Sequence, residues 1–521
     1  MHKISLSRQK LIDGITFLAL IGFYVKQNLW RVIGTDYNWD LLNYHLNNAT
    51  NSQAMVLHPA GIQSFFSPTL DRLLLPIHTL IPAPFSGILM LTPFVLNFYI
   101  VRNLFIGKLL QTRAMLPNTI AAVSIMPSMA ISQINNSMGD LILTPLALLA
   151  IYLLAEGLRV CDLKLVGGSG LLFGVLLGLK LSYSYLVISA LLVFLFFFFM
   201  KQARLLSGLV WSIFGILGYL LLSLPHLLRL QRDFGNPFFP FFNKYFDSPN
   251  FDEINFRDER FGLNNVHDYL RVPIQLAFGK NAGTSELTFQ DLRLLFIIGT
   301  LVIFIVLTAV RNLRRITLHQ SREYLFLFLF VIFSYVAWGK FLGISRYLIP
   351  IEIIGVAWAC SFFAREFSRI KTRRFIIEIF LLSTVLILTI TTSSVNWGHK
   401  KYSEKSVAFE KNVYKFSSER NAAYLLVDAP LAFLKYQSTL NEKQLWFSPA
   451  FNSYDLEQQS RLLRDRKIFT ISYSDNPEII DEVLKRYNLA SQQSCEAIQL
   501  RFSNDLTPSQ VFLCKTRSVS E

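Results

Sequence analysis

Charged residues are scarce in this chain. Asp, Glu, Lys and Arg together make up 16% of the 521 residues, whereas a soluble globular protein has about 25%. Hydrophobic residues make up 52%, and several apolar runs approach the roughly 20 residues that a helix needs to cross a bilayer. This composition excludes an ordinary soluble protein and indicates a membrane protein.

Several motifs are absent as well. The sequence has no GxGxxG and no Walker A pattern, which argues against a dinucleotide enzyme and an ATP-driven pump. It has no HExxH spacing for a structural metal and no convincing internal repeat, and the missing repeat weakens a secondary-transporter interpretation. It also lacks a basic stripe with interleaved aromatics, so we expect no nucleic-acid partner. No small-residue cleavage site follows the first apolar run, so no cleavable signal peptide is expected.

The apolar runs predict an α-helical polytopic membrane domain in residues 1–395. About eleven transmembrane helices are expected, near residues 11–28, 85–104, 116–134, 138–156, 165–179, 183–200, 206–224, 291–310, 323–339, 346–364 and 375–394. Lys and Arg precede the first of these spans and follow the second, fourth, sixth, eighth and tenth. The positive-inside rule therefore predicts a cytoplasmic N-terminus, with the loops 29–84 and 225–290 and the tail outside. The net charge of +15 is explained largely by these loops, which face anionic lipid.

The tail, residues 396–521, has a different pattern. YLLVDA, LWFSPAF and KIFTISYS are typical of buried strands, and LAFLKYQ, SYDLEQQSRLLRDR and PEIIDEVLKRY are typical of helices. This alternation predicts a small extracytoplasmic α/β domain.

Cysteine is rare, with four in the chain. Cys161 and Cys360 lie in or beside apolar spans and are expected to be inert. A hairpin around Asn504–Asp505 would place Cys495 opposite Cys514, and an oxidising compartment would allow a disulfide there.

The most informative segment follows the first apolar run. Gly34–Thr50, GTDYNWDLLNYHLNNAT, carries two carboxylates, Asp36 and Asp40. If Thr35 caps a helix, these acids lie four residues apart on one face. Two neighbouring carboxylates repel each other, which primes a general base, and they could equally share a divalent cation. The alternative is a solvated loop in which Asp36 merely caps a helix.

A family resemblance distinguishes the two acids. WDLLNYHL resembles the first-loop motif of bacterial membrane glycosyltransferases of the GT-C superfamily, in which an acidic residue precedes a Tyr-His pair; Asp40, Tyr44 and His45 match it. HPAGIQSFFSPTLD, FGNPFFPFFN and SRYLIPIE resemble further motifs of these enzymes, in order, across residues 1–395. The tail is not covered.

The resemblance implies an enzyme related in type to lipid A aminoarabinose transferases and protein O-mannosyltransferases. Such an enzyme of the bacterial inner membrane takes a hexosyl or pentosyl group from a polyprenyl-phosphate carrier and usually inverts the anomeric centre. The acceptor is a lipid, a glycan or a protein at the outer face. Carried over by position, Asp40 is the expected base and Asp36 the second choice. Outside the cytoplasm no nucleotide sugar is present, which agrees with a lipid-borne donor.

A phosphate leaving group needs cations to stabilise its developing charge. The candidates are Lys180, Arg229, Arg232 and Arg346, the last with its neighbour Tyr347. Lys180 stands at the outer junction of two spans, where a charge is a functional hypothesis and a snorkelling lysine is the alternative. His226 could contact phosphate or be an interfacial polar residue.

Asp140 is the third acidic candidate. It resembles a second-loop acid that GT-C enzymes often place near the site, where it could orient an acceptor or hold a metal, and the alternative is a helix N-terminal carboxylate. His45 could orient Asp40, contact phosphate or bind metal. A divalent cation, if one is used, would be held by Asp36, Asp40 and Asp140.

Two other functions fit part of the pattern. A flippase for a lipid-linked sugar would favour charges in the middle of spans, whereas here the acids gather in outer loops. A polymerase or ligase of the O-antigen type also has large outer loops, but such enzymes tend to rely on loop arginines.

Overall fold

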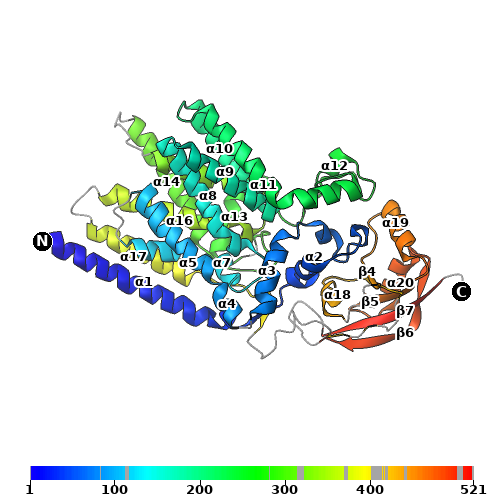
Figure 1. The fold of residues 1–521 in the computed structure, drawn as a ribbon. Helices are drawn as coiled ribbons and strands as arrows, with labels where there is room; N and C mark the ends of the chain where they lie inside the picture. The colour runs from blue at the N-terminus through cyan, green and yellow to red at the C-terminus, as the bar shows by residue number, and fades with distance from the viewer. Residues whose placement is uncertain are drawn as a thin grey trace.

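The computed structural model describes residues 2–81, 84–111, 116–280, 282–313, 322–368, 374–400, 413, 414, 416, 421–438, 443–500 and 509–518. It is mostly helical, with a sheet near the C-terminal end of the chain (Figure 1). The helix bundle fills one side of the molecule and the sheet the other, and the helices of the first loop lie between them.

The membrane part contains these helices: α1 (His2–Val32), α4 (Phe85–Leu89), α5 (Thr92–Tyr99), the π-helix η4 (Ile100–Leu109), α6 (Pro117–Ser124), α7 (Ser128–Ser132), α8 (Asp140–Val160), α9 (Leu163–Leu179), η5 (Leu181–Tyr183), α10 (Ser184–Phe199), α11 (Leu205–Phe234), α14 (Arg293–Leu313), α15 (Arg322–Phe341), η6 (Ser345–Leu348), α16 (Ile349–Ser368) and α17 (Arg374–Ile390). The first loop contains strand β1 (Thr35–Asp36), the π-helix η1 (Leu41–His45), α2 (Leu46–Thr50), η2 (Met55–Leu57), η3 (Gly61–Phe65) and α3 (Thr69–Leu80). The second loop contains α12 (Asn243–Phe246) and α13 (Val266–Ala277).

In the part of the chain that the structure describes, seven helical segments are long and apolar enough to cross a membrane. They are Phe85–Leu109, Asp140–Val160, Leu181–Phe199, Leu205–Phe234, Arg293–Val310, Arg322–Phe341 and Ser345–Glu366. The chain is therefore an integral membrane protein. Leu163–Leu179 and Phe375–Ile390 are shorter apolar helices at positions of expected spans. The first expected span lies within α1, which is 31 residues long but is not among the seven because polar residues such as Asp13 and Lys26 interrupt it.

The expected span 116–134 is wrong as a continuous helix. The segment is broken into α6 and α7, and Pro127, the residue directly before α7, is extended with ψ of 155°. Proline cannot donate to the preceding turn, and its ring disfavours helix in the residue before it. Both pieces are buried, and α6 is fixed by Asp13 of α1, which accepts hydrogen bonds from the amide and hydroxyl of Thr119 at 2.9 and 2.8 Å.

The second predicted loop begins later in the chain than expected. α11 runs through Pro225 to Phe234, so residues 225–234 are helical and the irregular chain starts at Gly235. Neighbouring groups can satisfy the carbonyl freed by a proline within a membrane helix.

The sheet near the C-terminal end has five strands in the order β4-β3-β5-β7-β6. They are β3 (Ala422–Leu426), β4 (Leu445–Phe447), β5 (Lys467–Ser472), β6 (Leu489–Gln499) and β7 (Gln510–Ser518), with the helices α18 (Phe433–Gln437), α19 (Ser453–Leu463) and α20 (Pro477–Lys485) between them. β3 is parallel to β4 and β5, and β7 is antiparallel to β5 and β6. The predicted strands and helices of the tail are therefore confirmed. A disulfide joins Cys495 of β6 to Cys514 of β7, and the expected turn around Asn504–Asp505 lies outside the described residues.

The C-terminal sheet region packs directly on the first loop (Figure 1). One buried cluster joins Tyr37 and Leu42 of that loop to Tyr424, Phe433 and Trp446. The first loop consists mainly of short helices. Many of its residues are buried, however, so the loop is largely an internal layer between the helix bundle and the sheet.

Candidate active site

The local structure around Asp36 differs from the prediction. Thr35 and Asp36 form strand β1, which pairs antiparallel with His399 and Lys400 of β2 (His399–Lys400). Asp36 and Asp40 therefore do not share a helix face, because Gly34 packs closely against the carbonyl of Lys400 and the chain leaves α1 as a strand.

Both oxygens of the Asp36 carboxylate accept hydrogen bonds from nearby groups. It accepts hydrogen bonds from the side chain of Asn38, at 2.7 and 2.9 Å, and from the amide of Ser137 at 2.8 Å. Its role is to join the first loop to the segment before α8.

Asp40 lies at the start of a π-helical turn. It immediately precedes η1, which ends with Tyr44 and His45. A π-helix bonds residues five apart and is frequent at functional sites, and here it turns the side chain five positions after Asp40 toward the same face. The rings of Tyr44 and His45 lie 4.2 Å apart, centroid to centroid.

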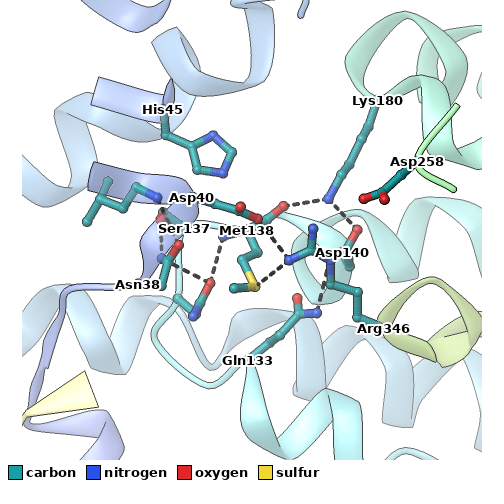
Figure 2. A network of polar contacts seen from close by, with 12 residues as sticks. Asn38, Asp40, His45, Gln133, Ser137, Met138, Asp140, Lys180, Asp258 and Arg346 are labelled. Carbon is teal, nitrogen blue, oxygen red and sulfur yellow. Dashed lines mark hydrogen bonds and ion pairs between the residues drawn. The ribbon is translucent and has the colours of Figure 1, made fainter. Parts of the chain in front are cut away.

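Two carboxylates and two cations meet next to this turn (Figure 2). Nη1 of Arg346 donates to Oδ2 of Asp40 at 2.8 Å, and Nε of Arg346 lies 3.8 Å from Oδ2 of Asp140. Lys180 forms an ion pair with the other oxygen of Asp140 and donates to the carbonyl of Met138 at 2.7 Å. The network is almost wholly buried: the Asp140 side chain is 1% exposed, and the most exposed, Lys180, 15%.

The ends of several helices bring these side chains together. Asp140 is the first residue of α8. Gly139 before it has φ of 85°, a backbone angle that residues other than glycine rarely adopt. A Cβ on Gly139 would also lie 2.6 Å from Leu70. Lys180 terminates α9, and Arg346 lies in η6 directly before α16. One end of the bundle thus carries the network.

Further residues hold the network in place. The amide of Gln133 donates to Asp140 at 3.1 Å, and the phenol of Tyr183 donates to the backbone carbonyl of Asp140 at 2.8 Å. The ring of Tyr347 lies under both cations, 5.3 Å from Nζ of Lys180 and 5.4 Å from the guanidinium of Arg346. Of these, the sequence indicated only Tyr347, because the others are recognised only by what they contact.

Electrostatics keep Asp40 ionised. Burial alone would raise the pKa of its carboxyl. The charges of Arg346 and Lys180, with the hydrogen bond from Arg346, act against burial, and the pKa lies below its ordinary value. Burial and the negative charge of Asp40 raise the pKa of the Tyr44 phenol well above its ordinary value. Tyr44 therefore remains protonated and able to donate.

His45 has a carboxylate partner that the sequence did not reveal. Its Nδ1 lies 2.6 Å from Oδ1 of Asp71 on α3, and both side chains are buried. Asp71 lies within the motif SPTLD, but its pairing across 26 positions leaves no local pattern.

Three predicted phosphate ligands lie elsewhere. His226 contacts the carbonyl of Phe65 at 2.9 Å, and Arg229 donates to the carbonyl of Gln53 at 2.9 Å. Arg232 pairs with the adjacent Asp233 at 2.8 Å, and its side chain is 74% exposed. These contacts tie α11 to the first loop and to itself rather than to the network of Asp40 and Arg346. The prediction placed them near the site because it ended the membrane helix before Pro225, whereas α11 continues to Phe234.

Within the described part of the chain, no group of three or more His, Cys, Asp or Glu side chains gathers where it could hold a metal ion. The carboxylate of Asp36 contacts Asn38 and Ser137. The carboxylates of Asp40 and Asp140 are instead paired with the cations Arg346 and Lys180. The three acids named for a metal therefore do not form one ligand set.

Comparisons with known proteins give little. No protein-family model matches the chain, and no curated protein sequence matches it. Among solved structures it is similar to the crystal structure of the oligosaccharyltransferase of Archaeoglobus fulgidus in the apo form. That match has 13% identity and a TM-score of 0.46, and it covers 89% of this chain and 69% of the other. A TM-score this low does not establish a shared fold, so the function has to be argued from the site.

Proposed function

We propose that this protein is a membrane glycosyltransferase that moves a sugar from a polyprenyl-phosphate carrier to a lipid, glycan or protein acceptor. The observation that carries the proposal is the buried convergence of Lys180 and Arg346 with Asp40 and Asp140 at one end of the helix bundle. The motif resemblance around Asp40, Tyr44 and His45 supports the same reaction.

The charges of the network suit a phosphate donor. Two carboxylates balance two cations, so the buried network is close to neutral. The phosphate of the donor is a diester with one negative charge, and it would compete with the carboxylates for the ammonium of Lys180 and the guanidinium of Arg346. Both donors would then face the bond that breaks and stabilise the charge developing on the leaving phosphate.

Asp40 is the proposed base. Its carboxylate accepts a hydrogen bond from Arg346 at 2.8 Å, and its pKa lies below the ordinary value. When a donor phosphate draws Arg346 away, the carboxylate loses its partner and can accept the proton of an acceptor hydroxyl. The network thereby couples arrival of the donor to release of the base.

The geometry also supports the proposed topology. Asp40 follows α1, Asp140 begins α8, Lys180 ends α9 and Arg346 precedes α16. The positive-inside pattern puts each of these positions outside. An outward-facing site agrees with a lipid-borne donor, a bacterial inner-membrane location and an extracytoplasmic C-terminal sheet region.

The test uses the purified full-length protein in lipid nanodiscs or liposomes. Undecaprenyl-phosphate sugars with labelled mannose, glucose or aminoarabinose are offered with an acceptor extract from a bacterial envelope. Acceptor-dependent release of undecaprenyl phosphate supports the proposal. Movement of the donor across the bilayer without bond cleavage indicates a flippase, and a requirement for a diphosphate-linked oligosaccharide indicates a polymerase or ligase. Either of these outcomes overturns the proposal.

A further inference from the structure

The proposed reaction leaves one proton to be placed. A carboxylate whose pKa lies below its ordinary value holds a proton weakly. If Arg346 returns to Asp40 at 2.8 Å once the phosphate leaves, the acquired proton has to move on. A nearby group with a greater proton affinity is therefore needed, within hydrogen-bond reach directly or through one water.

His45 has the geometry of such a group. Nδ1 of its ring lies 2.6 Å from Asp71, while Nε2 is buried and makes no hydrogen bond in the described structure. When Nδ1 donates its hydrogen to the carboxylate of Asp71, the lone pair is left on Nε2. Burying a nitrogen without a hydrogen-bond partner is unfavourable. The cost is offset where a bound substrate or a proton supplies the missing partner of the nitrogen.

The free nitrogen is directed at the base. In Figure 2 the imidazole of His45 has a ring nitrogen turned toward the carboxyl of Asp40. The π-helical turn produces this arrangement, since residues five apart do not share a face in an α-helix.

Several titratable groups surround His45, and none of those described below occupies its Nε2. Tyr44 on its own turn is a protonated donor, and His78 on α3 is a second histidine that interacts with it. Helix α18, which packs on η1, contributes Lys435, but its ammonium is turned to Asn51. Asp40, which receives the acceptor proton in the proposed reaction, is the group that a ring nitrogen of His45 faces in Figure 2.

We propose that His45 and Asp71 form a proton relay that takes the acceptor proton from Asp40; this inference rests on the proposed function. The acceptor O–H bond breaks and its proton passes to Asp40, while the oxygen forms a bond to the anomeric carbon. The bond from that carbon to the phosphate oxygen breaks, and its electron pair leaves on undecaprenyl phosphate. The proton then passes from Asp40 to Nε2 of His45, where Asp71 balances the imidazolium charge. His45 acts through Asp40 and is therefore a positioning residue.

The test is the pH dependence of transfer by the full-length protein, with the undecaprenyl-phosphate sugar that the assay above accepts. A relay through an imidazole gives the wild-type rate an acid limb between pH about 5 and 8. In His45→Gln the limb should disappear and kcat should fall by about 10²-fold, with KM for the donor unchanged. In Asp71→Asn the ring loses its counter-charge, so the limb should move to lower pH. His58→Gln, at another buried His–Asp pair, is the matched control and should keep the wild-type limb.

The outcomes are distinct. A wild-type acid limb that persists in His45→Gln with an unchanged kcat overturns the relay and leaves the glycosyltransferase intact. Absence of transfer by the wild type with every donor overturns both. If His45→Gln does not fold, as judged by its melting temperature, Asp71→Asn decides: an unmoved limb in that variant rejects the relay.

Discussion

Two buried His–Asp pairs in this molecule have similar distances and different surroundings. In one, His45 lies 2.6 Å from Asp71, and in the other His58 lies 2.9 Å from Asp455. His58 stacks on Phe451 with ring centroids 4.2 Å apart and also contacts the amide of Gln459 at 3.0 Å. The pair at His58 joins the first loop to α19, whereas the pair at His45 lies beside the Asp40 network.

The difference shows that a buried His–Asp pair alone does not identify an active site. Each ring has one nitrogen without a hydrogen-bond partner, Nε2 in His45 and Nδ1 in His58. The neighbours decide the function: aromatic rings surround His58 and stabilise a joint, whereas an ionised carboxylate and two cations lie near His45. The predictions below test whether chemistry depends on one pair and stability on the other.

The largest effect is expected at Asp40. Asp40→Asn keeps the size of the side chain but removes the proton acceptor, so transfer should fall by at least about 10³-fold at every pH. The measurement is release of undecaprenyl phosphate by purified protein, with folding checked by the melting temperature. Transfer near the wild-type rate would show that Asp40 is not the base.

The next largest effect is expected at the cations of the network. Lys180→Met removes one donor to the phosphate and leaves Asp140 with Arg346, so we expect a loss of about 10²-fold in kcat/KM. Steady-state kinetics over a range of donor concentrations measure it. Arg232→Met, at an exposed position far from the network, is the control and should keep the wild-type kcat/KM; equal losses in both variants would argue against phosphate binding by Lys180.

Breaking the pair of His58 and Asp455 should lower the stability of the protein rather than its activity. Asp455→Asn breaks the buried pair at His58 and also weakens the hydrogen bond from the amide of Phe451 at 3.0 Å. A loss of about 3–5 kcal/mol in the free energy of unfolding is expected from removal of one buried partner. It should lower the melting temperature while kcat of the folded fraction stays unchanged. A larger fall in kcat than in Asp71→Asn would reverse the comparison.

The smallest effect concerns pH and stability. Burial lowers the pKa of Lys435 from 10.5 to about 7. The unfolded chain therefore binds this proton more tightly than the folded chain, and stability should rise as the pH increases from about 7 toward 10.5. The melting temperature of the full-length protein should climb by a few degrees between pH 7 and 9, and Lys435→Met should flatten this rise. An equal slope in both proteins would show that Lys435 is charged when folded.

The sequence predicted the parts of the site that have local signals. Asp40, Asp140, Lys180 and Arg346 stand out because charges are rare beside apolar spans, and the structure brings all four together. Most strands and helices of the tail were also predictable, because alternation and amphipathic spacing are local properties.

The remainder depends on long-range contacts. Pairing of Asp36 with His399 turned an expected helix into a strand, and Asp71 becomes significant only through His45. Pro127 and Pro225 show the same limit: one breaks its helix and the other lies inside one, depending on whether neighbours satisfy the backbone.

A density map of the full-length protein with bound undecaprenyl phosphate tests the central claim most directly. The account predicts a phosphate within hydrogen-bond distance of both Lys180 and Arg346, with Asp40 released from Arg346 and turned toward His45. A phosphate bound instead by Arg229 or Arg232, with the ion pair of Asp40 and Arg346 intact, would contradict it.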